Sequence, residues 1–354
     1  MRGQALALLQ LAVWAAGQAA AAGCLRAATA LEHHDNPFAE GESRRAAWVS
    51  RLHFSGDGAL VDRPRLAVQV RHHCGVKRFW THAPARRRPG GIVANQIEVQ
   101  SAWQPHRRCL VDAQTSLKAK NVQRVPGEES YLRGVLGVGL TACGPHGVAV
   151  RASLDAGVED ARDTLLVDIA QRALGAQVSR RWASRGAVEA GVRWRRLRYD
   201  QPAWKAGPGG GIVAAGSKQL DESVEWTADG RLGEPLLACA GYARIRSDSN
   251  SLGYAYRAHR FQLVLARHVC WGFDAHAHAT AQFRTYPEDI PGAIDPGSRA
   301  QDEYAQKLVS VRLDRRLTAR HTLSGEYRWS RNGSVGSAGS CRNRVWSMAL
   351  DMLL

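Results

Sequence analysis

The sequence predicts an all-β chain that folds as a transmembrane, antiparallel up-and-down β-barrel of about 16 strands, within a range of roughly 14 to 18. Three observations predict this fold. Side chains alternate in polarity with a period of two along most of the chain. The connections between the alternating segments are alternately short and long. A segment typical of an export signal begins the chain.

Residues 1–23 are predicted to be a signal peptide, and residues 24–354 a single barrel domain. Arg2 supplies the positive charge, "ALALLQLAVWAAG" the apolar core, and "QAAAAG" the small residues that a signal peptidase needs. The core is shorter than a membrane-spanning helix, which needs about 20 apolar residues, and no later segment is long enough either. The "AAGC" sequence that ends at Cys24 also resembles a weak lipoprotein cleavage site, so lipidation of Cys24 is a less favoured alternative.

The alternation is clearest in "DAHAHATAQFRTY" (274–286). Asp274, His276, His278 and Arg284 share one face of the predicted strand, and alanines and Phe283 share the other. The same pattern recurs in "AAWVSRLHF", "RLAVQVRHH", "CLVDAQTSLK", "YLRGVLGVGLT", "GVAVRASLDAG", "AVEAGVRWRR", "LVSVRLD", "HTLSGEYRWS" and "VWSMALDMLL". Helical spacing fits none of these segments.

The connections between these segments alternate in length. Turn-like stretches such as "QPHRR", "CGPHG", "ASRG" and "VCWGF" are short, whereas the polar stretches 75–90, 119–129, 157–164 and 201–217 are predicted as long loops. Eight hairpins follow, and the first pairs "GCLRAATALEHH" with "RRAAWVSRLHF". The region 218–234 alternates poorly and is the weakest part of the prediction.

A soluble β-sandwich would also alternate, but it would need large inward residues to fill a core between two sheets. Here one parity carries charged or polar residues in nearly every segment. In a bilayer the sheet must close so that every backbone group is paired, with the apolar parity toward lipid and the polar parity toward water. Aromatic residues near segment ends fit interfacial girdles, namely Trp103, Tyr131, Trp194, Tyr242, Tyr254, Tyr256, Tyr286, Tyr304, Trp329 and Trp346.

A barrel of about 16 strands is too wide for side chains to fill, so the polar parity is predicted to line a water-filled pore. The predicted pore-lining residues are Arg51, Arg71, Arg133, Arg151, Asp155, Arg193, Asp274, His276, His278, Arg284, Arg312, Asp314, Glu326 and Arg328, and Arg195, Asp112 and Asp351 share their parity. Arginine predominates among these residues, and the whole chain has a formal net charge of +16. An arginine-rich aqueous path favours anionic solutes.

Several stretches of the chain resemble Gram-negative outer-membrane β-barrel proteins of the porin-like kind that are associated with exopolysaccharide or surface-assembly systems. "LEHHDNPF" is similar to the opening of such barrels, and "GEYRWSRNGSVGSAGSCRNRVWSMALDML" is similar to their closing hairpin; the stretch 244–286 also contributes. The resemblance implies an outer-membrane location, contact with lipid and lipopolysaccharide, and insertion by the barrel assembly machinery. It also implies passage of an anionic solute or polysaccharide. The chain departs from the family by ending in Leu354 instead of an aromatic residue.

Other chemistry finds less support in the sequence. His276 and His278 could share a metal, but no third ligand is identifiable, and "GPGGGIVAAG" lacks the Lys-Ser/Thr of a phosphate-binding loop. The seven cysteines are scattered singly, which supports neither a zinc site nor a disulfide framework. No cofactor, nucleic acid or enzymatic activity is predicted. The alternatives kept open are a non-conducting barrel that acts as a scaffold and, less favoured, a barrel lipid hydrolase; "PARRRPGG" is a candidate clamp for acidic groups.

Overall fold

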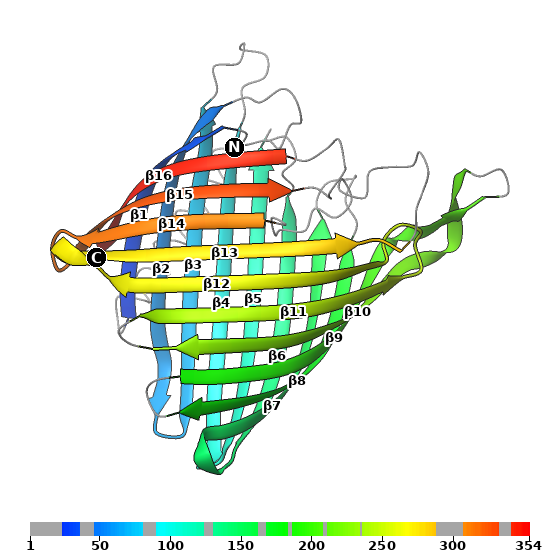
Figure 1. The fold of residues 1–354 in the computed structure, drawn as a ribbon, viewed down its shortest axis with the longest axis horizontal. Helices are drawn as coiled ribbons and strands as arrows, with labels where there is room; N and C mark the ends of the chain where they lie inside the picture. The colour runs from blue at the N-terminus through cyan, green and yellow to red at the C-terminus, as the bar shows by residue number, and fades with distance from the viewer. Residues whose placement is uncertain are drawn as a thin grey trace.

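The structure is a computed structural model, and it describes residues 23–35, 46–80, 90–123, 130–161, 168–182, 186–207, 211–233, 236–287, 307–332 and 341–354. Sixteen antiparallel strands follow one another around a closed barrel, and the first strand pairs with the last (Figure 1). The predicted fold and the predicted strand number are both confirmed. The described residues contain no helix that is long and apolar enough to cross a membrane.

The strands run from 10 to 21 residues. In chain order they are β1 Gly23–His34, β2 Ala47–Arg63, β3 Leu66–Trp80, β4 Gly91–His106, β5 Cys109–Gln123, β6 Tyr131–Cys143, β7 Val148–Ala161, β8 Ile169–Trp182, β9 Gly186–Ala206, β10 Ile212–Leu232, β11 Leu237–Ser249, β12 Tyr256–His268, β13 Phe273–Thr285, β14 Lys307–Arg316, β15 His321–Asn332 and β16 Cys341–Leu353. The predicted first hairpin is present, because His33 of β1 pairs with Trp48 of β2.

Short turns connect the strands at one end of the barrel. Two of them contain a single 3-10 turn, η2 (Pro145–Gly147) and η3 (Cys270–Gly272). In each, a non-glycine residue and the following glycine have positive φ: 57° and 73° for His146 and Gly147, 58° and 73° for Trp271 and Gly272. Two consecutive left-handed residues match the right-handed twist of a hairpin, and glycine adopts this conformation at no steric cost.

We expect Gly147→Ala to destabilise the barrel more than Gly272→Ala. Both substitutions place a Cβ at positive φ, which costs about 1 kcal/mol. A Cβ at position 147 would also collide with the backbone oxygen of Arg181, whereas the space around position 272 is open. Urea unfolding in lipid vesicles should show a loss at least twice as large for Gly147→Ala. Equal losses would contradict the proposed collision.

The two faces of the sheet differ in chemistry. One face of the sheet carries exposed aliphatic side chains all around the barrel, including Leu52, Leu140, Leu154, Val192 and Val311. The other face carries most of the ion pairs. The apolar cluster that the described residues form is small, comprising Val49, Phe79 and Ile92 with Val122 packed against it. Neither face is therefore covered by a second layer, which excludes a β-sandwich.

Several strands extend further than the sequence predicted. Stretches predicted as loops at 75–90, 119–129, 157–164 and 201–217 in fact continue the sheet to Trp80, Gln123, Ala161 and Ala206, and β10 begins at Ile212. The predictions of these loops were wrong because backbone pairing continues beyond the apolar part of each strand. The hairpin of β9 and β10 projects beyond its neighbours at the end with the long connections (Figure 1).

The projecting hairpin is held by the connection between β11 and β12. The backbone N–H of Trp204 donates to Ser251 Oγ at 3.0 Å, and Leu252 N–H donates to the Trp204 carbonyl at 2.8 Å. Asn250 accepts from the N–H of Leu220 at 2.8 Å through its side-chain oxygen. Gln219 is fully buried beneath this connection and accepts a hydrogen bond from Gln201 at 2.7 Å. The polar stretch that begins at Lys218 thus belongs to β10, which is irregular in register around Lys218 and pairs regularly with β9 from Leu220 to Leu232.

The predicted aromatic girdles are only partly correct. Tyr131 and Tyr256 face the charged side of the sheet, since they pair in register with Lys120 and Ser247. Their rings contact cations there: Lys118 Nζ lies 5.4 Å from the Tyr131 ring and Arg284 Cζ 4.9 Å from the Tyr256 ring. Tyr304 lies outside the described residues. The exposed aromatics on the apolar face of the strands are Trp48, Phe54, Trp80, Trp103, Trp182, Trp226, Phe261, Phe283 and Trp346.

Candidate functional site: the inner face of the barrel

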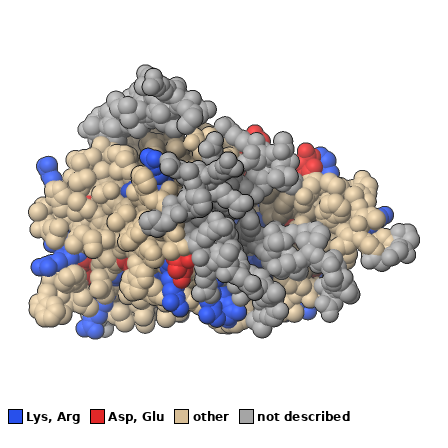
Figure 2. Space-filling view, turned by 90° about the horizontal axis from the view of Figure 1, so that it is seen from above, with Lys and Arg blue, Asp and Glu red and all other residues tan. Residues whose placement is uncertain are grey.

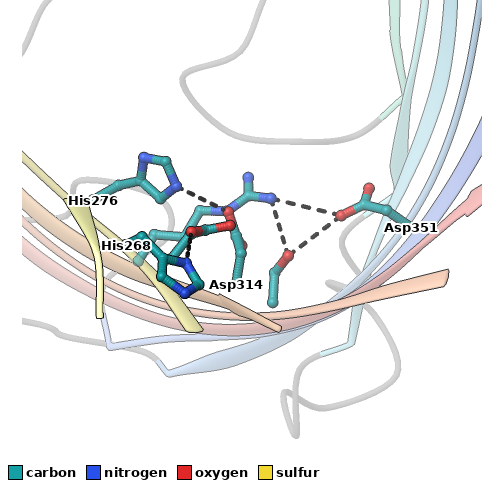
Figure 3. Close-up of polar contacts among 7 residues, drawn as sticks. His268, His276, Asp314 and Asp351 are labelled. Carbon is teal, nitrogen blue, oxygen red and sulfur yellow. Dashed lines mark hydrogen bonds and ion pairs between the residues drawn. The ribbon is translucent and has the colours of Figure 1, made fainter. Parts of the chain in front are cut away.

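All the predicted pore-lining residues lie on the same face of the closed sheet. Antiparallel partners share a face, and the register links these residues from strand to strand; for example, His276 pairs with Arg312, and Arg312 pairs with Glu326. The set on this face comprises Arg51, Arg71, Arg133, Arg151, Asp155, Arg193, Asp274, His276, His278, Arg284, Arg312, Asp314, Glu326 and Arg328, together with Asp112, Arg195 and Asp351. The close-up in Figure 3 shows His276, Asp314 and Asp351 on the concave side of the sheet, and we call this the inner face.

Three ion pairs on the inner face span an intervening strand. Arg151 on β7 donates two hydrogen bonds to the Asp112 carboxylate on β5, at 2.8 and 2.6 Å. Arg193 on β9 donates to Asp155 on β7 at 2.7 Å, and Arg260 on β12 pairs with Glu225 on β10. Side chains two strands apart meet only where the sheet curves toward them, so these contacts also identify the inner face.

Small residues on the intervening strand make room for these contacts. A Cβ at Gly139 on β6 would lie 2.5 Å from an Arg151 nitrogen and 2.7 Å from Asp112 Oδ2. Ala173 on β8 and Ala243 on β11 occupy the corresponding places under the other two pairs. Small residues at Gly139, Ala173 and Ala243 therefore allow the ion pairs to form across these strands. A larger side chain there would separate the arginine from the carboxylate.

A larger network joins β13, β14, β15 and β16 (Figure 3). Arg312 donates to Asp314 at 2.6 Å and to Ser324 Oγ at 2.9 Å, and its terminal nitrogen lies 3.6 Å from Asp351. His276 Nε2 lies 3.4 Å from Asp314, and His268 contacts Asp274 at 2.8 Å. The network holds one guanidinium among two carboxylates and a hydroxyl at the wall of the barrel.

Other predicted residues also have charged or polar partners. Arg51 lies 3.2 Å from Glu32, Arg328 2.9 Å from Glu326, and Arg133 3.9 Å from Glu159. Arg71 pairs in register with Asp57, and His278 contacts the Thr280 hydroxyl at 3.1 Å. Carboxylates thus accompany most of the predicted arginines, and the field of the inner face is weaker than the arginines alone would produce.

Water reaches these charges. The side chains of Arg151, Arg193 and Arg312 are 39%, 51% and 43% exposed even though each is engaged with a carboxylate. A guanidinium can keep such exposure on the inner face of a barrel only if the interior is not filled by side chains.

Sequence reasoning missed several charged residues of the inner face. Glu32, Glu159, Glu225 and Arg260 were not among the predicted lining residues. Glu32 and Glu159 share the parity of their predicted neighbours, so a strict application of the alternation would have found them. Glu225 lies in the poorly alternating stretch, and only the register with β11 places it on the inner face.

The contacts of the described residues do not assemble a hydrolytic site. Ser324 Oγ contacts Arg312 and Asp351, at 2.9 and 3.3 Å, and no serine hydroxyl in the described part of the chain is bonded to a histidine. His321 contacts Thr318 at 2.8 Å. Within the described ranges, no group of three or more His, Cys, Asp or Glu side chains could hold a metal ion. Six cysteines are free thiols, and of the basic loop "PARRRPGG" only the last two glycines are described.

The chain is a closed barrel of 16 antiparallel strands with an apolar outside and a charged inside, which is the architecture of a transmembrane β-barrel. No protein-family model matches the chain, and no curated protein matches its sequence.

The solved structures that are similar to the chain include the following three. One is a mutant of the porin from Rh. blastica, with 10% identity, a TM-score of 0.41, and coverage of 94% of this chain and 99% of the porin. Another is a loop-deletion mutant of OmpT, an outer membrane protein of Vibrio cholerae, with 11% identity, a TM-score of 0.44, and coverage of 94% and 99%. A third is a bacterial polysaccharide outer membrane secretin, with 8% identity, a TM-score of 0.43, and coverage of 93% and 98%.

Proposed function

We propose that this chain forms a water-filled pore in the outer membrane of a Gram-negative bacterium, with a preference for anionic solutes or an anionic polysaccharide. One observation carries the proposal: the inner face of a closed barrel holds charged side chains that remain partly exposed, as at Arg151 and Arg193. Charged groups retain water in this way along a hydrated path and not in a packed core.

The anion preference rests on arginine, which is the commonest charged residue among the predicted lining positions. The ion pairs reduce this preference without removing it, because the arginine is more exposed than the carboxylate in pairs such as Arg151–Asp112, at 39% against 25%, and Arg193–Asp155, at 51% against 26%. We therefore propose a moderate preference for anions over cations. This preference is set by the balance of positive and negative charge at each ion pair and not by one highly charged constriction.

The signal peptide predicted at residues 1–23 supports the proposed location. A signal peptide followed by a barrel with an apolar exterior is what an outer-membrane protein needs to leave the cytoplasm and insert into a bilayer. We propose that residues 1–23 are removed on export, that the barrel assembly machinery inserts the mature chain, and that the short turns face the periplasm.

Planar-bilayer recordings of the refolded mature protein test the pore. We expect stepwise conductance in 1 M KCl and a reversal potential of the anion-selective sign in a salt gradient. Circular dichroism and resistance of the folded barrel to detergent at room temperature would show that the sample is folded. A folded barrel that inserts but does not conduct would overturn the proposal.

One observation favours a second candidate, a non-conducting barrel that acts as a scaffold in surface assembly. The hairpin of β9 and β10 projects past the neighbouring strands and is braced by the connection at 250–255. A braced projection of this kind can present a binding surface. Absence of conductance together with retention of a partner by the hairpin would favour this candidate.

A further inference from the structure

Tyrosine and arginine side chains gather on the inner face of β9–β13, near the end with the long connections. We call five of them the mouth cluster: Arg195 and Tyr199 on β9, Tyr256 on β12, Arg284 on β13, and Tyr286 directly after β13. The register places them on one face, since Tyr256 pairs with Ser247 on β11 and Arg284 pairs with Ala258 on β12. The three tyrosines are half-buried, so part of each side chain stays accessible at the wall.

The cluster is ordered on one side by contacts among its own members. The rings of Tyr256 and Tyr286 lie 6.1 Å apart, and Arg284 Cζ lies 4.9 Å from the Tyr256 ring. With its amide oriented so that the oxygen faces Arg284, the buried side chain of Gln282 accepts from Arg284 Nε at 2.6 Å and from Nη2 at 2.8 Å. An aromatic ring and an amide therefore orient this guanidinium.

A hydrogen-bond network orders the other side of the cluster. Tyr199 hydrogen-bonds to the Asp221 carboxylate on β10, which also accepts from Ser249 Oγ at 2.5 Å and from Gln219 Nε2 at 3.2 Å. Gln219 is fully buried. The hydroxyl of Tyr199 is thus anchored to the wall of the barrel, and its ring is held in a defined position.

Arg195 is the exposed cation of the cluster. It forms no ion pair with any residue in the described ranges, whereas Arg193, two residues earlier on the same face, donates to Asp155 at 2.7 Å. Asp221 interacts with Arg195 electrostatically, but this carboxylate is already engaged by three donors. The guanidinium of Arg195 therefore keeps its hydrogen-bond donors for water or for an anionic ligand.

These groups together match the chemistry of an acidic saccharide. A tyrosine ring presents an apolar face and a hydroxyl, which suit the C–H face and the hydroxyl groups of a pyranose ring. A guanidinium donates paired hydrogen bonds to a carboxylate. A small inorganic anion would use the two arginines, but it would gain nothing from the three rings beside them.

The dimensions and the position of the cluster indicate a ligand longer than one sugar. Four strand spacings separate β9 from β13, roughly 19 Å around the wall, which a short oligosaccharide can span. The long connections of a transmembrane barrel face the outside of the cell, so the cluster lies at the outer mouth. On the face seen in Figure 2, basic side chains outnumber acidic ones, which favours the approach of an acidic polymer.

We propose that the mouth cluster binds a segment of a uronic-acid polysaccharide. Carboxylates of the segment lie against Arg195 and Arg284, and its sugar rings lie against Tyr199, Tyr256 and Tyr286. The inference rests on the proposed hydrated pore and deepens it by naming the class of saccharide and the side chains that recognise it.

Isothermal titration calorimetry of the refolded mature protein in detergent, with tetragalacturonate as the probe, tests the proposal. Maltotetraose, which has the same number of sugar units and no carboxylate, is the comparison ligand. We expect the natural chain to bind tetragalacturonate at least tenfold more tightly than maltotetraose. Equal affinities, or no measurable binding of tetragalacturonate, would overturn the proposal.

Two matched variants locate the site. The variant Arg195→Gln with Tyr286→Ala removes one charge and one ring, and should bind tetragalacturonate at least tenfold more weakly than the natural chain. The control Arg231→Gln with Tyr286→Phe removes one charge from the inner face near the short turns and keeps the ring, and should bind within twofold of the natural chain. If the first variant fails to fold, Arg195→Gln alone takes its place and should lower the affinity at least threefold.

The remaining outcomes separate this site from the pore. Unchanged binding in the first variant, or an equal loss in the control, would overturn the mouth cluster. Conductance is recorded on the same preparations. Conductance without saccharide binding would overturn the site and leave the pore, whereas saccharide binding without conductance would overturn the pore and leave the site.

Discussion

Asp112→Asn and Arg151→Gln are expected to change the ion selectivity of the pore in opposite directions. In the natural chain the two side chains form a bidentate pair on the inner face, so their charges largely cancel. Removing the carboxylate leaves one uncompensated guanidinium, and removing the guanidinium leaves one uncompensated carboxylate. A unit charge about 7 Å from a passing ion is worth about 0.6 kcal/mol in water, or nearly threefold in local concentration.

The reversal potential in a tenfold KCl gradient measures this effect. We expect Asp112→Asn to raise the anion-to-cation permeability ratio roughly threefold or more, and Arg151→Gln to lower it by a similar factor. The double variant removes both charges and should return close to the natural ratio. Shifts of the same sign in both single variants would mean that the pair acts through barrel shape, and no shift in either would mean that ions do not pass this part of the wall.

The fold could be predicted from the sequence because the side chains of each barrel strand alternate between polar and apolar. Each strand of "DAHAHATAQFRTY" type shows by itself which residues share a face, and the order of short and long connections gives the hairpins. The strand ends could not be predicted as well. Beyond the apolar band both faces are polar, as at Arg195 on the inner face and Arg196 on the outer face, so hydropathy no longer distinguishes a strand from a loop.

The inner face could be predicted residue by residue, but its contacts could not. Parity places Asp112 and Arg151 on one face, yet only the register of three consecutive strands brings their side chains together over Gly139. The same holds for Arg260 and Glu225 across Ala243. Consequently the sequence suggested a strongly basic interior, whereas the structure pairs much of that charge with carboxylates.

Outward-facing arginines near the long connections of β8, β9 and β11 escaped sequence reasoning for a related reason. Arg172, Arg196 and Arg246 stand on the parity predicted to face lipid, where charge is unexpected, and no single segment shows that they are neighbours. Adjacent strands bring them together only through their register. Charge that breaks an alternating pattern near the end of a strand is thus informative once the strands are aligned.

Leu154→Arg is expected to destabilise the barrel strongly, whereas Ser153→Arg on the next residue is not. Leu154 is 53% exposed and pairs with Val138 and Leu174, so its side chain projects from the apolar face in the middle of β7. Arginine at the midplane of a lipid-facing strand costs about 2 to 4 kcal/mol. Ser153 pairs with Gly139 and Gly175 on the inner face, where a guanidinium would meet water instead of lipid.

Urea unfolding of the two variants in phospholipid vesicles measures the difference in the free energy of unfolding. The comparison is sharp because adjacent residues share a strand, a depth and a backbone conformation and differ only in the face that they occupy. The same experiment in detergent should reduce the cost of Leu154→Arg, since micelles adapt to a charged group more readily than a bilayer. If Leu154→Arg proved harmless and Ser153→Arg destabilising, the apolar face could not be the one that meets lipid. The charged interior and the selectivity of the Asp112–Arg151 pair would then have to be reassigned.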